Sequence, residues 1–225
     1  MNNAMEYQSK RNHTQVPDFV AYPTITHLYP NTSSQIGACL YQELPRYAAK
    51  VASANNNVTK ASDLEHFFKI QWSLIFESKI PVAEVLVEPM GDIFDTEYWS
   101  LVPFARGNIH ITSSNPTDTA RIDPKYFMLD FDFQSQVQVS RFIRHLYSTQ
   151  PLANQVGAEI SPSLNTVATN AKDEAWSGFI KSSCTCILLS VANIDNFEAN
   201  KAYRSIQLSP HFHSRHNAEG NRWCG

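Results

Sequence analysis

Long runs of apolar or like-charged residues are missing from this sequence of 225 residues. The longest apolar stretch, residues 186–192, is far shorter than the ~20 residues that a helix needs to cross a bilayer. The N-terminal residues contain no apolar segment of the kind found in a signal peptide. The formal net charge is only -3, with no block of one sign, so neither a nucleic-acid nor a membrane partner is indicated.

Several familiar motifs are also missing. No G-x-G-x-x-G turn follows a strand pattern, so the sequence encodes no recognisable dinucleotide-binding unit. It contains no P-loop, no nucleophile elbow and no HExxH metal motif. The four cysteines form no CxxC pair and define no disulfide framework.

The composition, with 43% hydrophobic and 17% charged residues, fits one globular domain that can bury a core without disulfides or metals. Residues 1–33 are polar and show no clear period, which predicts a loose N-terminal segment. Three N-glycosylation sequons start at Asn12, Asn31 and Asn57. They fit either chance, because Asn, Ser and Thr are common here, or a segment of a secreted protein.

Apolar periodicity separates helices from strands along the rest of the sequence. Apolar residues three and four apart predict helices over 34–50, 62–80, 132–147 and 173–181. Short β-branched runs predict strands over 82–87, 99–104 and 108–112. The expected fold class is α+β, with an antiparallel β-sheet backed by helices.

The most informative motif starts at Trp99 and reads W-S-L-V-P-F-A-R-G-N-I-H-I-T-S-S-N-P, followed by R-I-D-P-K-Y-F. It resembles the signature of the C-terminal, substrate-binding domain of the glucose–methanol–choline (GMC) flavin oxidoreductases, especially fungal glucose oxidases and alcohol oxidases. The segments D-F-D-F-Q-S-Q, T-Q-P-L-A and D-E-A-W-S-G-F-I follow in the family's order. The resemblance covers residues 34–183, which are the expected GMC substrate-binding domain.

The resemblance implies a six-stranded antiparallel sheet that lies over the flavin of a separate FAD-binding domain. It also implies FAD as the cofactor, with hydride transfer from a primary or secondary alcohol or a sugar to the flavin, and a histidine as base. Neither the Rossmann-like FAD-binding half nor the histidine motif H-P-x-(G/S)-T is found in the sequence. We therefore expect a fragment, truncated at both ends and inactive as given, since losing a base alone costs ~10²–10⁴-fold in rate.

Three residues are assigned to the substrate pocket by this resemblance. Glu84, in V-A-E-V-L-V, matches a glutamate that supports the second catalytic histidine in glucose oxidases. Leu86 stands where those enzymes have an aromatic residue, which argues against glucose itself as the substrate. Trp99 matches a tryptophan that lines the pocket. Without the resemblance, a strand glutamate would be read as solvated and the tryptophan as core. No catalytic residue and no metal ligand is assigned, and the cofactor-binding residues stay unknown.

Residues 184–225 do not resemble the family. Cys184–Cys186 can be encoded with the splice-donor sequence GTACGT, and Tyr203-Arg204 with an acceptor YAG. Removing the bases between them shifts the frame, and the shifted frame can encode H-P-I-S-T followed by P-K-E-I-G-G-V, as the family has. We therefore expect an unspliced intron, with a frame-shifted tail in which His211, His213 and His216 are artefacts and not a metal site.

Other interpretations stay open. The domain could serve as a non-enzymatic ligand-binding or interaction module, because a fold does not fix a function. The parent enzyme could act on an alcohol intermediate of a fungal secondary-metabolite pathway. An FAD-domain partner and a homodimer are both compatible with the sequence. The full-length relative would be secreted, whereas the absence of a signal peptide here leaves a cytoplasmic location open.

Overall fold

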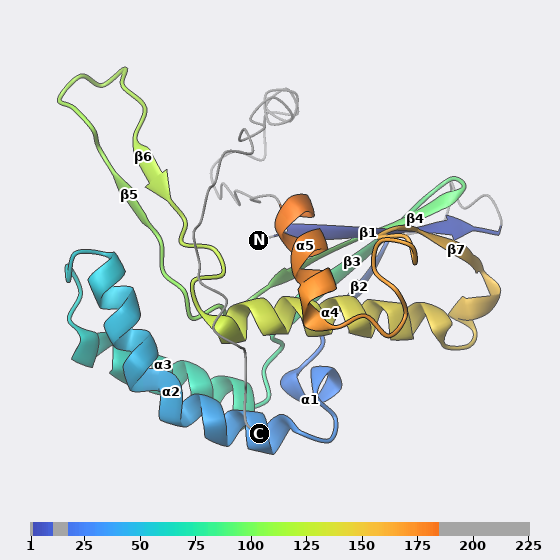
Figure 1. Cartoon of the computed structure of the whole chain (residues 1–225), viewed down its shortest axis with the longest axis horizontal. Helices are drawn as coiled ribbons and strands as arrows, with labels where there is room; N and C mark the ends of the chain where they lie inside the picture. The colour runs from blue at the N-terminus through green and yellow to red at the C-terminus, as the bar shows by residue number, and fades with distance from the viewer. Residues whose placement is uncertain (1, 11–17, 185–225) are drawn as a thin grey trace. The chain divides into compact units, whose positions relative to one another are not determined.

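A computed structural model describes residues 2–10 and 18–184 of the chain, and the central element of this part is a five-stranded sheet (Figure 1). All neighbouring strands run antiparallel, in the order β2-β3-β4-β1-β7. The strands are β1 (Asn2–Ser9), β2 (Phe19–Ala21), β3 (Ala83–Met90), β4 (Ile93–Ser100) and β7 (Val156–Ser161). A separate two-stranded ladder joins β5 (Asn108–His110) and β6 (Arg121–Asp123).

The β3–β4 hairpin sets the register of the sheet. Met90 pairs with Ile93, so the turn has two residues, and Gly91 in it adopts a φ of 62° that favours glycine. Along β3, burial alternates with the two-residue period of a strand, so that one face of the sheet is covered and the other is not.

Helix α4 (Asp130–Ser148) packs on the covered face of the sheet. Polar pairs tie it to β4 inside the core: the hydroxyls of Tyr98 and Ser140 lie 2.6 Å apart, as do those of Thr96 and Tyr147. Tyr147 also stacks on Tyr7 of β1, with ring centroids 4.1 Å apart. Buried hydroxyl pairs of this kind fix the position of the helix, because a slip would leave each group unsatisfied.

Two long helices, α2 (Ser33–Ala54) and α3 (Ala61–Phe76), form an antiparallel pair beside the sheet layer (Figure 1). They approach closely at Gly37, where an added Cβ would lie 2.7 Å from the ring of Phe76, and the Gly37 carbonyl accepts a hydrogen bond of 2.8 Å from the indole of Trp72. The remaining helices are short: α1 (Ile25–Leu28), the 3₁₀ turn η1 (Leu152–Asn154) and α5 (Asp173–Ser183).

The predicted fold class is confirmed, and so are the four predicted helices, which correspond to α2, α3, α4 and α5. The described sheet has five strands instead of the six that the resemblance implied. The strand predicted over 99–104 is wrong beyond Ser100. There the carbonyls of Val102 and Pro103 accept hydrogen bonds from the Gln71 side chain, so the backbone is satisfied without a strand partner.

The prediction of a loose N-terminal segment over residues 1–33 is also wrong where the structure describes it. Strand β1 lies inside the sheet, between β4 and β7, and β2 forms an edge. Asn3, Met5 and Tyr7 of β1 are all buried. The predicted domain of residues 34–183 therefore needs this N-terminal strand to complete its sheet, and the two belong to one compact unit.

The frame-shifted tail predicted for residues 184–225 lies outside the described residues, apart from Cys184, and so do the three tail histidines. Within the described ranges, no helix is both long and apolar enough to cross a membrane. No cluster of three or more metal-ligating side chains occurs in them either.

Candidate functional site

The uncovered face of the sheet is the candidate site, and we call it the open face. It consists of the alternate side chains of β3 and β4 that point away from α4, together with Tyr22 beyond the end of β2. Ser100 marks the covered side, since its hydroxyl accepts a hydrogen bond of 2.8 Å from Gln136 of α4. Trp99, the residue before Ser100 in β4, therefore points to the opposite, uncovered face. The members of the open face are Tyr22, Glu84, Leu86, Glu88, Asp95, Glu97 and Trp99.

The structure brings the three sequence-predicted pocket residues together on the open face. Glu84 is the direct cross-strand partner of Trp99, and Leu86 follows two positions along β3 on the same side. Opposite residues of an antiparallel pair have Cβ atoms about 5 Å apart, so the carboxylate and the indole are neighbours. All three side chains are partly exposed, as residues that meet a ligand must be.

Tyr22 joins this group from a segment that was predicted to be loose. Its hydroxyl donates a hydrogen bond to Oε1 of Glu84 over 3.4 Å, and its side chain is 53% exposed. An aromatic residue therefore stands on either side of the Glu84 carboxylate. Tyr22 could not be selected from the sequence alone, because β2 has only three residues and no periodicity of its own.

The open face is acidic. Burial, followed by the nearby charges of Glu97, Asp18 and Asp95, raises the pKa of Glu88 above its ordinary value. Burial also raises the pKa of Asp95, whose Oδ1 has no hydrogen-bond partner among the described residues. The ion pairs found in the described part of the chain all lie elsewhere. This face therefore repels anions and can accept hydrogen bonds from hydroxyl groups.

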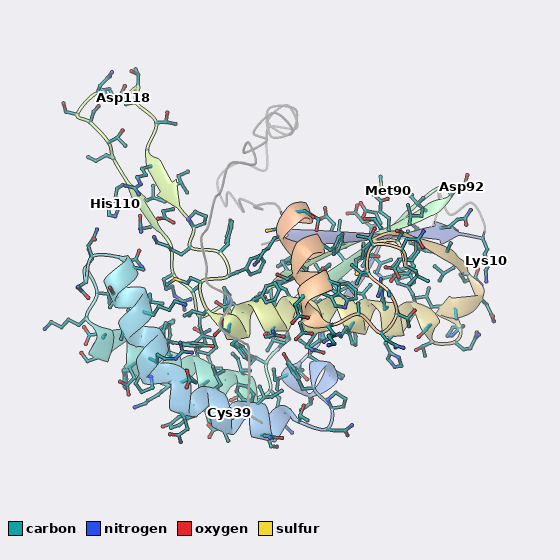
Figure 2. All side chains as sticks on the ribbon, in the orientation of Figure 1. Lys10, Cys39, Met90, Asp92, His110 and Asp118 are labelled. Atoms are coloured by element: carbon teal, nitrogen blue, oxygen red, sulfur yellow. The ribbon has the colours of Figure 1, made fainter. Side chains whose placement is uncertain are left out.

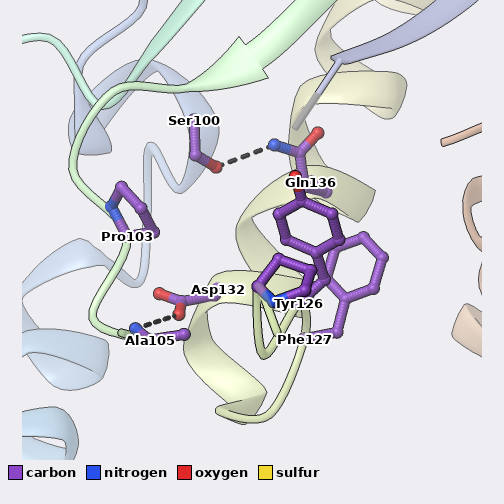
Figure 3. Close-up of a pocket in the computed structure, with 8 residues that line it drawn as sticks. Ser100, Pro103, Ala105, Tyr126, Phe127, Asp132 and Gln136 are labelled. Atoms are coloured by element: carbon purple, nitrogen blue, oxygen red, sulfur yellow. Dashed lines mark hydrogen bonds between the residues drawn. The ribbon is translucent and has the colours of Figure 1, made fainter. Parts of the chain in front are cut away.

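A hollow lies on the other side of β4 and has a volume of about 170 Å³ (Figure 3). The carboxylate of Asp132 in its wall accepts hydrogen bonds from the backbone N–H groups of Phe104 (2.8 Å) and Ala105 (2.7 Å), and burial raises the pKa of Asp132 to about 6. Ligand pockets usually measure ~300–1,000 Å³. The hollow is smaller than that, and its polar groups already have hydrogen-bond partners. We therefore interpret Asp132 as a residue that holds the 103–105 loop in place, and we do not assign the hollow to a ligand.

The described residues fit only part of a flavin dinucleotide. Their sheet is antiparallel throughout, so it has no parallel βαβ unit whose helix could receive a diphosphate. Trp99, Leu86 and Tyr22, in contrast, offer aromatic and aliphatic surface against which a planar ring and a small substrate can lie.

Comparison with known proteins identifies a family to which part of this chain is similar. Residues 103–189 match the family model of the GMC oxidoreductases. The glucose oxidase-like protein fsoC of Humicola fuscoatra is 30% identical over 157 residues, which make up 69% of this chain and 26% of the relative. The glucose oxidase of Aspergillus carbonarius is 26% identical over 161 residues, covering 71% of this chain and 26% of the relative.

Solved structures support the same fold. A fungal aryl-alcohol oxidase superposes with a TM-score of 0.60 at 14% identity, covering 79% of this chain and 35% of that chain. An FAD-dependent oxidoreductase from Chaetomium thermophilum gives a TM-score of 0.56 at 15% identity, covering 81% and 35%. The chain thus spans about a quarter of the length of these curated relatives and about a third of these structures.

Proposed function

Because this chain carries the C-terminal domain of the GMC oxidoreductases in residues 103–189, we propose that its open face is the substrate-facing wall of an FAD-dependent enzyme. The reaction would oxidise the hydroxyl-bearing carbon of a small alcohol or sugar. The observation that carries the proposal is the cross-strand pairing of Glu84 with Trp99 on an uncovered sheet face.

FAD, when bound, supplies the hydride acceptor. The residues of this chain would bind and orient the substrate beside it. Trp99 and Leu86 form an apolar wall that fixes the carbon skeleton and excludes water. The Glu84 carboxylate, held by the Tyr22 hydroxyl, accepts a hydrogen bond from a substrate hydroxyl or from an imidazole of the kind that the family resemblance implies. Glu84 is then a positioning residue and not itself the base.

The chemistry of the open face favours a neutral substrate. Its carboxylates disfavour acids, and a flat aromatic edge with an aliphatic neighbour accommodates an aryl or aliphatic alcohol as well as a sugar ring. Leu86 leaves more room than an aromatic residue would, so we favour a substrate other than glucose, such as an alcohol intermediate of a fungal secondary-metabolite pathway. We expect no turnover by this chain alone, because its described residues offer no complete site for FAD.

Reduction of flavin under anaerobic conditions tests this proposal. The chain would be combined with the flavin-binding portion of a fungal relative and mixed with a panel of alcohols and sugars, while flavin absorbance is followed. Trp99→Ala and Glu84→Gln should each slow the reduction at least about tenfold, as expected when a substrate-orienting contact is lost. Glu65→Gln, a matched change in a partly exposed ion pair of α3, should have no effect. If the two open-face variants reduce flavin at the same rate as the unmodified chain, the proposal is wrong.

A second candidate is a module that binds a sugar or alcohol without oxidising it. The carboxylates and aromatic residues of the open face favour it, since such groups recognise hydroxylated ligands without a cofactor. Titration calorimetry of the chain alone with the same panel separates the two functions. Micromolar binding without flavin would support the module, whereas binding only in the flavin-loaded assembly would support the enzyme.

We also propose that the protein is secreted and glycosylated at Asn57. The sequon Asn57-Val58-Thr59 lies in the turn between α2 and α3, where all three side chains are exposed and Val58 is 79% accessible. Asn31 is exposed as well, and Asn12 lies outside the described residues. Expression behind a secretion leader, followed by glycosidase treatment, should show a mass shift that Asn57→Gln reduces and that Asn56→Gln does not. An unmodified Asn57 peptide from secreted protein would contradict this.

A further inference from the structure

A hollow of about 180 Å³ lies between α1 and α4, and we call it the α1–α4 hollow. Figure 1 shows α1 beside α4. The α4 residues that line the hollow are Gln138, Arg141, Phe142 and His145. They recur every three or four positions and therefore form one stripe along the helix. Ser140 and Tyr147, which bond to the sheet, lie outside this stripe. The hollow is thus separate from the open face, which lies on the far side of the sheet.

The first turn of α1 fixes the proton of His27, which lines the hollow from the other helix. The backbone N–H of Thr24 donates a hydrogen bond of 3.1 Å to Nδ1 of His27. A ring nitrogen that accepts a hydrogen bond carries no proton, so the proton of the neutral imidazole is on Nε2. A metal ion would need a free lone pair on that nitrogen. His27 therefore favours a ligand that accepts hydrogen bonds over a metal ion.

Arg141 brings positive charge to the hollow and is held in place from one side. Its Nη2 donates hydrogen bonds to Oδ1 of Asp173 (2.6 Å) and to the carbonyl of Ala171 (3.2 Å). Its Nε and Nη1 groups donate to no residue in the described part of the chain. Hydrogen bonds from a guanidinium to a carboxylate are roughly twice as strong as those between neutral groups. Asp173 offsets part of the charge, so we expect affinity in the millimolar range.

The other lining residues are uncharged or apolar. The Gln138 amide and the His145 ring have no side-chain hydrogen bond within residues 2–10 and 18–184. Leu28 and Phe142 form the apolar part of the wall. No carboxylate is among the lining residues, in contrast to the acidic open face. In contrast to the hollow beside Asp132, this one presents donors that have no partner among the described residues.

We propose that the α1–α4 hollow binds a small organic carboxylate, with its charge at Arg141 and its hydrocarbon part against Leu28 and Phe142. The volume of about 180 Å³ is small for a drug-sized ligand. It is ample for a small ion, because a water molecule takes up only ~30 Å³. A phosphate fits less well, since the two apolar residues would leave some of its oxygens without a hydrogen bond. The inference does not depend on the proposed function.

NMR of the histidine side chains tests the proposal on the full chain, because these residues sample different parts of the surface. Sodium butyrate is titrated at pH 7 and constant ionic strength. The ring signals of His27 and His145 should shift together and saturate at millimolar concentrations. Those of His66 on α3 and His110 on β5 should stay unchanged, and Figure 2 shows His110 on the β5–β6 ladder. Butanol, the uncharged counterpart, should bind at least about tenfold more weakly.

Three variants identify the groups that hold the carboxylate. Arg141→Met should weaken butyrate binding at least about tenfold, because it removes the charge-assisted donors. His145→Ala should weaken it about two- to tenfold, because it removes one donor. Arg46→Met is the matched control, since Arg46 of α2 also forms an exposed ion pair, and it should bind like the unmodified chain. Thermal unfolding confirms that each variant is folded.

Several outcomes would overturn the proposal. Shifts at His66 or His110 equal to those at His27 and His145, or no saturable shift at all, would show that there is no specific site. Equal binding of butanol would show that the charge is not recognised. Tighter binding of inorganic phosphate would mean that the ligand class is wrong, and displacement of butyrate by Zn²⁺ would identify a metal site. A folded Arg141→Met variant that binds butyrate normally would also contradict the assignment.

Discussion

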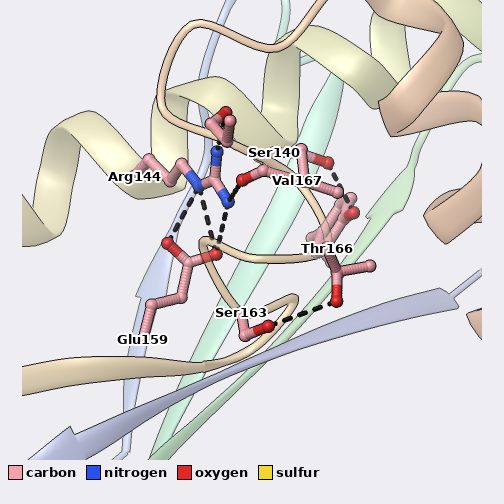
Figure 4. A network of polar contacts seen from close by, with 8 residues as sticks. Ser140, Arg144, Glu159, Ser163, Thr166 and Val167 are labelled. Atoms are coloured by element: carbon pink, nitrogen blue, oxygen red, sulfur yellow. Dashed lines mark hydrogen bonds and ion pairs between the residues drawn. The ribbon is translucent and has the colours of Figure 1, made fainter.

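Replacing Arg144 by methionine should destabilise the domain much more than replacing Arg141, the other arginine of α4. Its guanidinium forms a two-pronged ion pair with Glu159 of β7, at 2.7 Å from Nη2 and 2.9 Å from Nε (Figure 4). It also donates to the carbonyls of Val167 (2.6 Å) and Ala168 (3.1 Å), and lies 4.4 Å from the ring centre of Trp176. One side chain therefore joins α4, β7, the loop before α5 and α5 itself.

The expected loss of stability follows from how deeply the ion pair is buried. The side chains of Arg144 and Glu159 are only 13% and 6% exposed, so solvent screens the pair little. Breaking a buried pair by removing one partner costs about 3–5 kcal/mol, because the other charge stays buried and alone. For a domain of this size, that corresponds to a fall of roughly 10 °C in the unfolding temperature.

Arg141 provides a matched control on the same helix. It forms an ion pair of 2.6 Å with Asp173, but both side chains are more than a third exposed. An exposed pair contributes about 0–1 kcal/mol, so Arg141→Met should cost under about 1 kcal/mol. Thermal and urea unfolding at pH 7 would compare the two variants with the unmodified chain.

The pH dependence gives an independent check on the Arg144 variant. Burial already raises the pKa of Glu159 despite the nearby Arg144. Without the guanidinium this pKa must rise further, so the variant should lose stability as the pH increases through it. The difference in free energy of unfolding between the variant and the unmodified chain should be smaller at acid pH, because a protonated Glu159 needs no counter-charge. Equal costs for Arg144→Met and Arg141→Met, or a deficit that does not change with pH, would refute the reasoning.

Three further changes test the packing outside the open face. Asp132→Asn should remove a pH-dependent step in stability. Burial raises the pKa of Asp132 from 3.8 to about 6, so between these pH values the folded state binds more protons than the unfolded state. The free energy of unfolding of the unmodified chain should therefore fall by about 3 kcal/mol as the pH rises through this range. Gly107→Ala should cost about 1–3 kcal/mol in urea unfolding, because its Cβ would meet Pro124 Cα at 2.7 Å. Tyr98→Phe should cost about 1 kcal/mol in thermal unfolding, since it deletes one buried hydroxyl bond to Ser140.

Each of these predictions has an outcome that contradicts it. If Asp132→Asn keeps the same pH profile, the titration belongs to another group. An unfolding curve of Gly107→Ala that coincides with the original would mean that the base of the β5–β6 ladder can relax around a methyl group. If Tyr98→Phe stabilises the chain, the hydroxyl pair does not hold α4 on the sheet.

The helices could be predicted from sequence because their signal is local. In α2 the buried residues recur every three or four positions, as in Leu40, Leu44, Tyr47 and Val51. Strand β3 was predictable for a similar reason, since its sequence is short, contains β-branched residues and partly alternates between apolar and polar residues. Each of these patterns can be read without knowledge of the partner that buries it.

Strand β1 could not be predicted because its signal is not local. Its residues are mostly polar, and what makes them a strand is pairing with β4 and β7, about 90 and 150 positions away along the chain. Asn3 is buried only because Gln136 of α4 accepts a hydrogen bond from its amide (3.4 Å) and Ser183 of α5 donates one to its carbonyl (3.3 Å). Each of these polar groups looks like a surface residue until its distant partner is known.

In the candidate site, too, the sequence could indicate which residues matter but not how they are arranged. Family resemblance could select Glu84, Leu86 and Trp99, but not show that they share a face. That depends on the two-residue turn at Gly91, which pairs Glu84 with Trp99. A register slip of one residue would turn the tryptophan toward α4 and leave the carboxylate without its aromatic neighbour. The turn is therefore as necessary to the open face as the residues that line it, although Gly91 itself contacts no substrate in the proposed arrangement.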